Sequence, residues 1–340
     1  MPVFDVSSLL ASMNADPRTP AGNPSVERFN SASFRRAIDQ LCRFNRDDTT
    51  TLLLEGEPGT GKTSLARYLH DTSSRKGKPF QYAVLSAIED TLAASDLFGH
   101  VAGAFTDARQ SRNGLFASAH GGTLFLDEIG KASLAVQQKL LHVIEYHEFR
   151  PVGSDRDVRT DVRLILASNV SLAAAVEAGH FLPDLYARIA TFRTRLPALR
   201  ERRADIPDLI GVALRKHARA TGYATAPEIH PELLDALLRA GWPHNLRELD
   251  ATMHRLLLEA DGADVLLLDH CRNELQHLAS FASGGVLTSD RIEAAVKEAR
   301  TIAGAARLLG VDRTTIHRHR RRSTLATSES PCGPPDVNPA

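Results

Sequence analysis

The chain has few cysteines, no long apolar run and no excess of either charge. Its three cysteines, Cys42, Cys271 and Cys332, include no C-x-x-C pair, which indicates neither a disulfide framework nor a zinc site. No apolar run reaches the roughly 18 residues of a membrane span, and residues 1–5 lack the basic start of a signal peptide. We therefore expect a cytoplasmic protein with no membrane contact. With 41 basic and 41 acidic residues the net charge is zero, so only the distribution of charge along the chain can indicate a partner.

A glycine-rich loop organises the chain. Residues 56–63 have the form G-x-x-x-x-G-K-[ST]; an apolar run at 51–54 leads into them, and apolar residues at helical spacing follow. Strand, loop and helix in this order can turn backbone N–H groups toward phosphate oxygens. Lys62 would reach the β- and γ-phosphates of ATP and Thr63 would ligate Mg²⁺, whereas the simpler alternative is an ordinary glycine turn. The predicted nucleotide-binding residues of this loop are Gly56, Glu57, Pro58, Gly59, Thr60, Gly61, Lys62, Thr63 and Ser64.

Two further apolar runs end in polar residues. Residues 121–126 lead into Asp127 and Glu128, and the end of a buried parallel strand is where charge can appear beside a phosphate loop. Asp127 would hold Mg²⁺ through water and Glu128 would polarise the attacking water, although a solvated strand end is the alternative. The run at 162–167 leads to Asn169, which could sense the γ-phosphate or could be a turn residue.

Between these carboxylates and the phosphate loop lies a segment with an unusual pattern. Residues 96–108 contain two glycines around small residues and a single aromatic residue, Phe105. Phe105 could lie at an exposed loop tip that contacts a partner, or it could be a buried anchor.

The region after the third strand shows helical patterns. Pro231 begins one helix and Gly241 closes it; Asn245 is expected to cap the next, with Glu248 at capping-box spacing. Arg247 then lies in the first turn, where a cation opposes the helix dipole, so it is either a functional residue or an idle surface arginine.

The last part of the chain is basic. Residues 288–322 carry nine basic and four acidic residues, a net charge of +5, and their pattern predicts a helix-turn-helix that ends in a basic helix. Binding of this helix to DNA is favoured over the alternative, a solvated basic helix end. The predicted DNA-contacting residues are Arg313, Thr314, Thr315, His317 and Arg318, with Arg320, Arg321 and Arg322 on phosphates.

Together these motifs resemble the bacterial enhancer-binding proteins of the NtrC type, AAA+ ATPases that activate sigma-54 RNA polymerase. The resemblance covers residues 23–322 and includes, besides the motifs above, Leu97-Phe98-Gly99-His100, Phe149-Arg150-Pro151-Val152-Gly153, residues 196–202 and residues 242–249. It implies an α/β AAA+ P-loop NTPase with a parallel sheet and an α-helical lid, plus a C-terminal all-α helix-turn-helix domain of the Fis type.

The resemblance also implies site roles and partners. Arg247 would contact the phosphates of ATP as sensor II, and Arg188 would act on the nucleotide of a neighbouring subunit in a ring. The loop that would engage the sigma factor is formed by Gly103, Ala104, Phe105, Thr106 and Asp107. The implied partners are upstream DNA, the sigma-54 RNA polymerase holoenzyme and further copies of the chain, from a dimer to a hexameric ring.

The expected division of the chain follows the motifs. Residues 1–22 are expected to be a flexible leader too short for a sensory domain, so that a regulatory protein in trans or the expression level would control activity. The remaining expected segments are 23–195 for the α/β subdomain, 196–262 for the lid, 263–286 for a linker, 287–322 for the DNA-binding domain and 323–340 for a disordered tail.

Four positions depart from the family pattern. Asp107 replaces a loop glycine, Val84 stands where an asparagine usually restrains the catalytic glutamate, Leu182 replaces the first of two trans arginines, and Thr63 replaces a glutamate. Thr63 returns the loop to the general P-loop form and is expected to be harmless. Two functions are considered: an activator that couples ATP hydrolysis to remodelling of the holoenzyme, and a nucleotide-responsive DNA-binding regulator with weak ATPase activity and no sigma-54 remodelling, which Asp107, Val84 and Leu182 favour.

Overall fold

The structure, a computed structural model, describes residues 29–88, 90–106, 108–271 and 301. The predicted leader, most of the predicted linker, the helix-turn-helix with all eight candidate DNA contacts, the tail and Asp107 lie outside the described residues.

A five-stranded sheet forms the centre of the α/β part, with strand order β2-β3-β6-β1-β7 and every pairing parallel. The strands are β1 (Leu52–Glu55), β2 (Phe80–Val84), β3 (Thr123–Asp127), β6 (Arg163–Ser168) and β7 (Arg193–Arg195). The strands predicted at 51–54, 121–126 and 162–167 are thus confirmed as β1, β3 and β6. The two outer strands, β2 and β7, were not identified from their sequence pattern.

Helices cover both faces of this sheet because the central strands are apolar on both sides. Leu52 and Leu54 of β1 point into one core, and Leu53 points into the other. The first core also contains residues of α2 (Ala32–Phe44) and α3 (Lys62–Asp71). The second face is covered by α4 (Asp90–Phe98), α5 (Leu115–Ser118), α6 (Leu134–Tyr146), α7 (Leu172–Glu177) and α8 (Pro183–Ile189). A small hairpin of β4 (Glu148–Phe149) and β5 (Val158–Arg159) follows α6.

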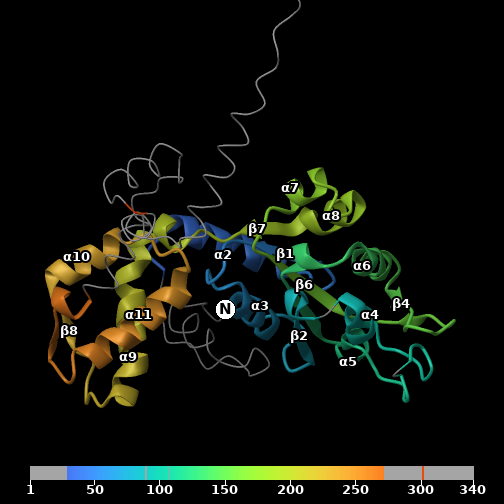
Figure 1. Cartoon of the computed structure of the whole chain (residues 1–340). Coiled ribbons are helices and arrows are strands. Elements are labelled where there is room, and N and C mark those ends of the chain that lie inside the picture. The colour runs from blue at the N-terminus through green and yellow to red at the C-terminus, as the bar shows by residue number, and fades with distance from the viewer. Residues whose placement is uncertain (1–28, 89, 107, 272–300, 302–340) are drawn as a thin grey trace, which may run out of the picture.

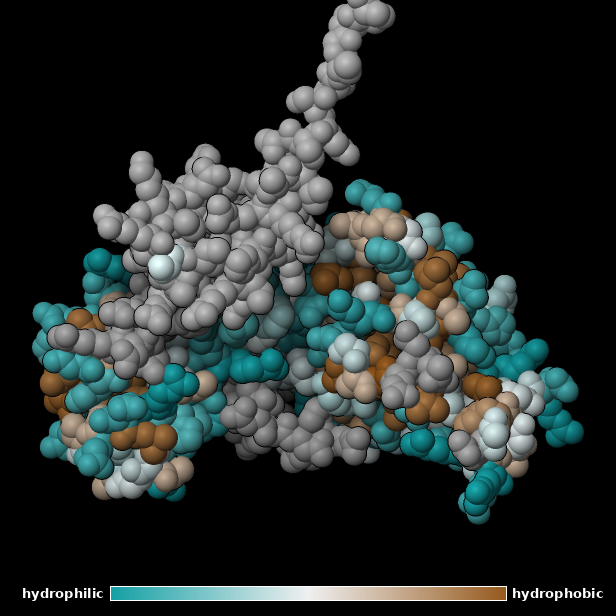
Figure 2. Space-filling model, viewed as in Figure 1, coloured by the Kyte–Doolittle hydropathy of each residue, from teal (hydrophilic) through white to brown (hydrophobic). Residues whose placement is uncertain are grey.

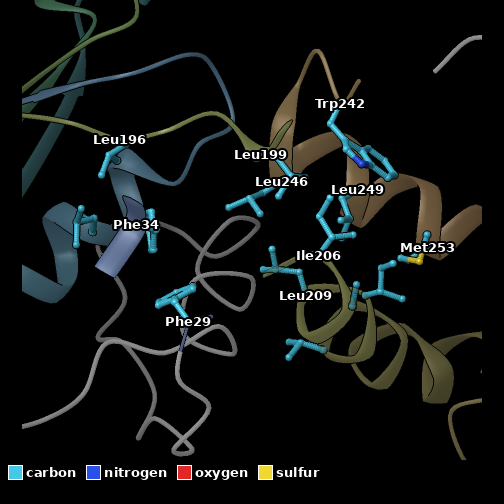
Figure 3. Close-up of a cluster of buried hydrophobic side chains, with 14 of the residues drawn as sticks. Phe29, Phe34, Leu196, Leu199, Ile206, Leu209, Trp242, Leu246, Leu249 and Met253 are labelled. Carbon is cyan, nitrogen blue, oxygen red and sulfur yellow. The ribbon is translucent and has the colours of Figure 1, made fainter. Parts of the chain in front are cut away.

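The described part of the lid contains three α-helices and lies to the left of the α/β part in Figure 1. They are α9 (Ile206–Ala218), α10 (Pro231–Arg239) and α11 (Asn245–Glu259). Figure 3 shows Leu246, Leu249 and Met253 of α11 beside Ile206 and Leu209 of α9, with Phe34 of α2 across from them. The first core therefore runs from the sheet into the lid. Each of its buried leucines stabilises the fold by about 1.5–3 kcal/mol relative to exposure.

Two expectations for the lid need correction. The lid continues past residue 262, because β8 (Glu228–Ile229) pairs with β9 (Val265–Leu266), and Leu266 and Cys271 are buried in its core. Helix α11 begins at Asn245, but the Asn245 side chain does not cap it. The carboxylate of Glu248 instead accepts a hydrogen bond from the His244 N–H at 3.0 Å. The Asn245 side chain instead forms hydrogen bonds to the phosphate loop and to the Leu199 N–H.

Apolar residues lie in separate patches among polar ones on the face seen in Figure 2. Within the part of the chain that the structure describes, no helix combines the length and the apolar character needed to cross a bilayer.

Candidate nucleotide site and partner loop

The polar strand ends predicted from the sequence meet at one edge of the sheet. In the parallel register Glu55 of β1 is opposite Ser168 of β6, and Val84 of β2 is opposite Asp127 of β3. Strand β6 lies between β1 and β3. Asn169, which follows β6, therefore lies between the phosphate loop and the two carboxylates, at the carboxyl edge where open parallel sheets bind ligands.

The phosphate loop has the backbone that its glycines allow. Gly59 and Gly61 adopt positive φ angles of 78° and 105°, and Gly61 is the residue before the first turn of α3. Lys62, in that first turn, donates hydrogen bonds from Nζ to the carbonyl oxygens of Gly56 at 2.6 Å and Glu57 at 3.0 Å. The loop thus curls around the ammonium group and keeps a positive charge at its centre.

Charge is concentrated in this buried region. Burial lowers the pKa of Lys62, while the negative charges of Asp127 and Glu128 partly offset that effect. Burial likewise raises the pKa of Asp127, opposed by Lys62 and by the hydrogen bond from the Glu128 N–H. The Thr63 hydroxyl lies 3.4 Å from Asp127 Oδ2. A hydroxyl and a carboxylate at this spacing supply the hard oxygen ligands that Mg²⁺ prefers.

Glu128 is held in an uncommon conformation. Its backbone lies in the left-handed region, with φ 58° and ψ 42°, which costs a residue other than glycine about 1–3 kcal/mol and is typical of functional sites. The Asn169 side-chain amide donates to Glu128 Oε1 at 3.1 Å, whereas Asn169 Oδ1 is buried and has no hydrogen-bond partner among the described residues. Asn169 therefore contacts the candidate catalytic carboxylate directly, a contact that the sequence analysis missed. Val84, at the end of β2, cannot hydrogen bond to it through its side chain.

Together these groups fit a nucleoside triphosphate with a divalent cation. Among the described residues, Lys62 Nζ donates to two loop carbonyls, which phosphate oxygens could replace, and Asn169 Oδ1 has no hydrogen-bond partner. The lid adds Arg247, exposed in the first turn of α11, whose positive charge lowers the pKa of Lys62. Arg247 is thus close enough to the phosphate loop for the predicted role.

The Phe105 loop is built as a tight, exposed projection. The Gly103 N–H donates to the Ala108 carbonyl at 2.7 Å, and the Ala108 N–H donates to the Phe105 carbonyl at 2.9 Å. Phe105 is 39% exposed and packs edge-to-face on His100, with ring centroids 4.9 Å apart. Phe105 is therefore at an exposed loop tip, not a buried anchor.

Comparison with known proteins agrees with this architecture. The Sigma-54 interaction domain family matches residues 28–195, and the AAA+ ATPase lid domain family matches residues 200–284. Residues 28–195 of the chain belong to the Sigma-54 interaction domain family.

Relatives of the chain include two curated regulators. The chain is 40% identical to the Nif-specific regulatory protein of Azotobacter vinelandii over 290 residues, 82% of this chain and 55% of that protein. It is also 40% identical to the DNA-binding transcriptional regulator NtrC of Klebsiella pneumoniae over 250 residues, 74% of this chain and 53% of that protein. The chain thus spans about half the length of these relatives. Among solved structures, NtrX from Brucella abortus in complex with ATP matches with a TM-score of 0.66 and 26% identity, covering 90% of this chain and 70% of that one.

In this sigma-54 interaction domain, Arg188 lies far from its own phosphate loop. It is exposed on α8 and lines a cavity of about 310 Å³ together with Thr51, which precedes β1, and Val162, which precedes β6. These residues mark the amino edge of the sheet, opposite the edge that carries Lys62. The position is consistent with action on another subunit's nucleotide. Leu182 precedes α8, and its N–H donates to Gln137 Oε1 at 2.8 Å, so it holds the helix start in place.

Sequence reasoning missed several residues that border the site. Tyr82 of β2 stacks on Phe125, and its pKa is raised to about 12 by burial and by the charge of Asp127. Arg200 and Arg202 contact the phosphate loop from the start of the lid. The motif at 196–202 marked the two arginines as part of the family pattern, but nothing in it indicated what they contact. No local pattern marked Tyr82.

Proposed function

We propose that this chain is a sigma-54-dependent transcriptional activator that couples ATP hydrolysis to remodelling of the RNA polymerase holoenzyme. The observation that carries the proposal is the combination of two features in one sigma-54 interaction domain. The phosphate loop, Asp127, Glu128 and Asn169 meet at one sheet edge, and Phe105 projects from a separate exposed loop. The first feature can bind and cleave a nucleotide, and the second can contact a partner.

Different residues of the chain bind the phosphates, hold the cation and activate the attacking water. ATP with Mg²⁺, when bound, supplies the phosphoanhydride bond and the cation that neutralises its charge. The backbone N–H groups of the loop and the start of α3 bind phosphate oxygens, and Lys62 exchanges the Gly56 and Glu57 carbonyls for them. Thr63 and Asp127 would hold the cation. Glu128 Oε1, now bonded to Asn169, would accept a proton from the water that attacks the γ-phosphorus; the bond from that phosphorus to the β–γ bridging oxygen breaks, and ADP leaves with that oxygen. Arg247 would order the phosphates from the lid.

Transcription requires further partners. We propose that copies of the chain assemble into a ring in which Arg188 of one subunit reaches the nucleotide of the next. Related trans arginines contribute about three to five decades of rate. Because Leu182 occupies the place of the other expected arginine, hydrolysis is proposed to be slow and to depend on Arg188 alone. Residues 287–322 are proposed to bind upstream DNA.

Transcription in vitro with sigma-54 holoenzyme tests the proposal. We expect the wild-type chain to activate with ATP, Glu128→Gln to lose both hydrolysis and activation, and Phe105→Ala to lose activation while it keeps hydrolysis. Leu258→Ala, which removes an apolar side chain that is 58% exposed on the lid, is the control and should retain both. A wild-type chain that hydrolyses ATP but does not activate the holoenzyme would favour the nucleotide-responsive regulator instead.

The trans role of Arg188 has its own test. ATPase activity per subunit should rise with protein concentration as rings form, and Arg188→Ala should remove that rise while the monomer still binds ATP. Robust turnover that does not depend on Arg188 would contradict the assignment.

A further inference from the structure

The outer turn of the phosphate loop is hydrogen bonded to the lid along its whole length. The Pro58 carbonyl accepts from Asn245 Nδ2 at 2.9 Å, and the Gly59 carbonyl accepts from the Leu246 N–H at 3.0 Å. The Thr60 carbonyl accepts from Arg202 Nη2, also at 3.0 Å. Three consecutive loop carbonyls therefore have lid groups as their partners, although loop and lid are far apart in the sequence.

A charged pair reinforces these bonds at the first variable position of the loop. Arg200 Nη1 donates to Glu57 Oε2 at 2.7 Å, and Arg200 Nη2 donates to the other carboxylate oxygen. Asn245 Nδ2 reaches the same Glu57 Oε2 at 3.2 Å, while Asn245 Oδ1 accepts from the Leu199 N–H at 2.6 Å. The Asn245 amide thus joins three segments: the loop, the turn that contains Arg200, and helix α11. We call Glu57, Arg200 and Asn245 the loop–lid clamp.

The two backbones of the clamp lie in direct contact. A Cβ atom placed on Gly59 would be 2.2 Å from the His244 carbonyl oxygen, so no side chain separates loop from lid. Asn245 itself has a positive φ of 54°, a left-handed conformation that asparagine adopts more readily than most residues other than glycine. The amide of Asn245 is bonded to the loop, and the Glu248 carboxylate accepts from the His244 N–H at the start of α11.

The buried side of the same junction is also fixed. Arg202 is fully buried with its guanidinium 4.1 Å above the Phe34 ring. Asp205 accepts hydrogen bonds from the backbone N–H groups of Asn30 and Ser31 at 2.6 and 2.7 Å. The start of the lid is therefore tied both to the phosphate loop and to the segment that leads into α2.

Arg247 follows Asn245 by two residues on the same helix. Its Cβ would lie 3.4 Å from a Cβ on Gly59, so its distance from the phosphates depends on where the clamp holds the first turn of α11. We propose that the loop–lid clamp is a positioning device that makes the phosphate loop and the first turn of α11 one rigid unit and so fixes Arg247 over the nucleotide. Movement of the lid then carries the phosphate loop with it. The inference rests on the proposed nucleotide binding for its functional consequence.

A double-mutant cycle tests the device. ATP affinity is measured with a fluorescent ATP analogue and Mg²⁺ for wild type, Arg200→Gln, Arg247→Ala and the double variant. Because Arg200 acts through Arg247, each single change should weaken affinity about tenfold, and the double variant should bind about as well as either single variant. Losses that multiply, or no loss in Arg200→Gln, would overturn the proposal. Arg239→Gln breaks an exposed lid ion pair with Asp235 and is the matched control, with affinity unchanged.

A second measurement does not require nucleotide binding. Amide hydrogen exchange at Leu246, which donates to Gly59, and at Leu199, which donates to Asn245, should speed up at least about tenfold in Glu57→Gln and in Asn245→Ala, while amides in the middle of α11 keep their protection. Unchanged exchange at both amides would show that the clamp does not hold the two segments together. If the wild-type chain binds no nucleotide, the proposed function fails, yet this measurement still decides whether the clamp exists.

Discussion

Replacing Gly59 by alanine separates the steric contact between loop and lid from the ordinary cost of a glycine substitution. Gly59 and Gly77 share a φ of +78°, yet a Cβ on Gly59 meets the His244 carbonyl at 2.2 Å and a Cβ on Gly77 meets nothing within 4 Å. Alanine at either position is destabilising by about 1–2 kcal/mol, because a residue with a Cβ is unfavourable in the left-handed region. Only Gly59→Ala also collides with another backbone.

The collision sets the additional cost. Real Cβ contacts essentially never fall below 3.0 Å, so loop and lid must separate by about 0.8 Å. That shift stretches the bonds from Leu246 N to Gly59 O and from Asn245 Nδ2 to Pro58 O, now 3.0 and 2.9 Å. Each is worth about 1 kcal/mol net. We therefore expect Gly59→Ala to lower the free energy of unfolding by about 3–4 kcal/mol and Gly77→Ala by about 1–2 kcal/mol.

The assay uses the single tryptophan of the chain. Trp242 is fully buried in the lid, with Nε1 donating to the Leu237 carbonyl at 3.0 Å. Urea unfolding followed by its fluorescence reports on the part of the fold that the substitution disturbs. Equal losses of unfolding free energy in the two variants would refute the reasoning. They would show that the start of α11 moves aside for the new methyl group without loss of stability.

Three other predictions concern buried polar groups. Arg163 is fully buried, none of its three guanidinium nitrogens has a hydrogen-bond partner among the described residues, and burial lowers its pKa to about 10. Arg163→Met should therefore raise the free energy of unfolding by about 1–4 kcal/mol at pH 7, and a loss would show that the charge is compensated. Burial lowers the pKa of His70 to about 4, whereas the usual value in an unfolded chain is about 6.5. The unfolded chain therefore binds a proton at His70 before the folded chain does. The free energy of unfolding should fall by up to about 3 kcal/mol as the pH is lowered from about 6.5 to about 4. Urea curves across this range should show a smaller loss in His70→Gln, and identical pH profiles would contradict the assignment. Asn169→Ala should lower the kcat of ATP hydrolysis at least about tenfold with little change in KM, because Glu128 loses its orienting amide; a higher kcat would mean that this amide holds Glu128 away from water.

The sequence alone determined the features that depend on local pattern. The strand, loop and helix around Lys62, the carboxylates at the end of β3 and the starts of α10 and α11 follow from apolar periodicity, glycine positions and proline positions. Each of these signals lies within about ten residues, so the pattern can be recognised in a single sequence. The exposure of Phe105 was left open by its sequence, since an aromatic residue between small residues can be buried or exposed.

Tertiary structure decided which of these local features touch. Glu57 and Arg200 are 143 residues apart and Glu57 and Asn245 are 188 apart, and no periodicity connects them. The same holds for the pairing of Glu128 with Asn169, 41 residues apart, and for the pairing of β9 with β8, which extends the lid past residue 262. Asn245 shows the reason most clearly. Its sequence context favours a local cap, but in the folded chain its amide makes two bonds to the loop and one to the turn at Leu199. These long-range partners prevail because they satisfy buried polar groups that would otherwise remain unpaired.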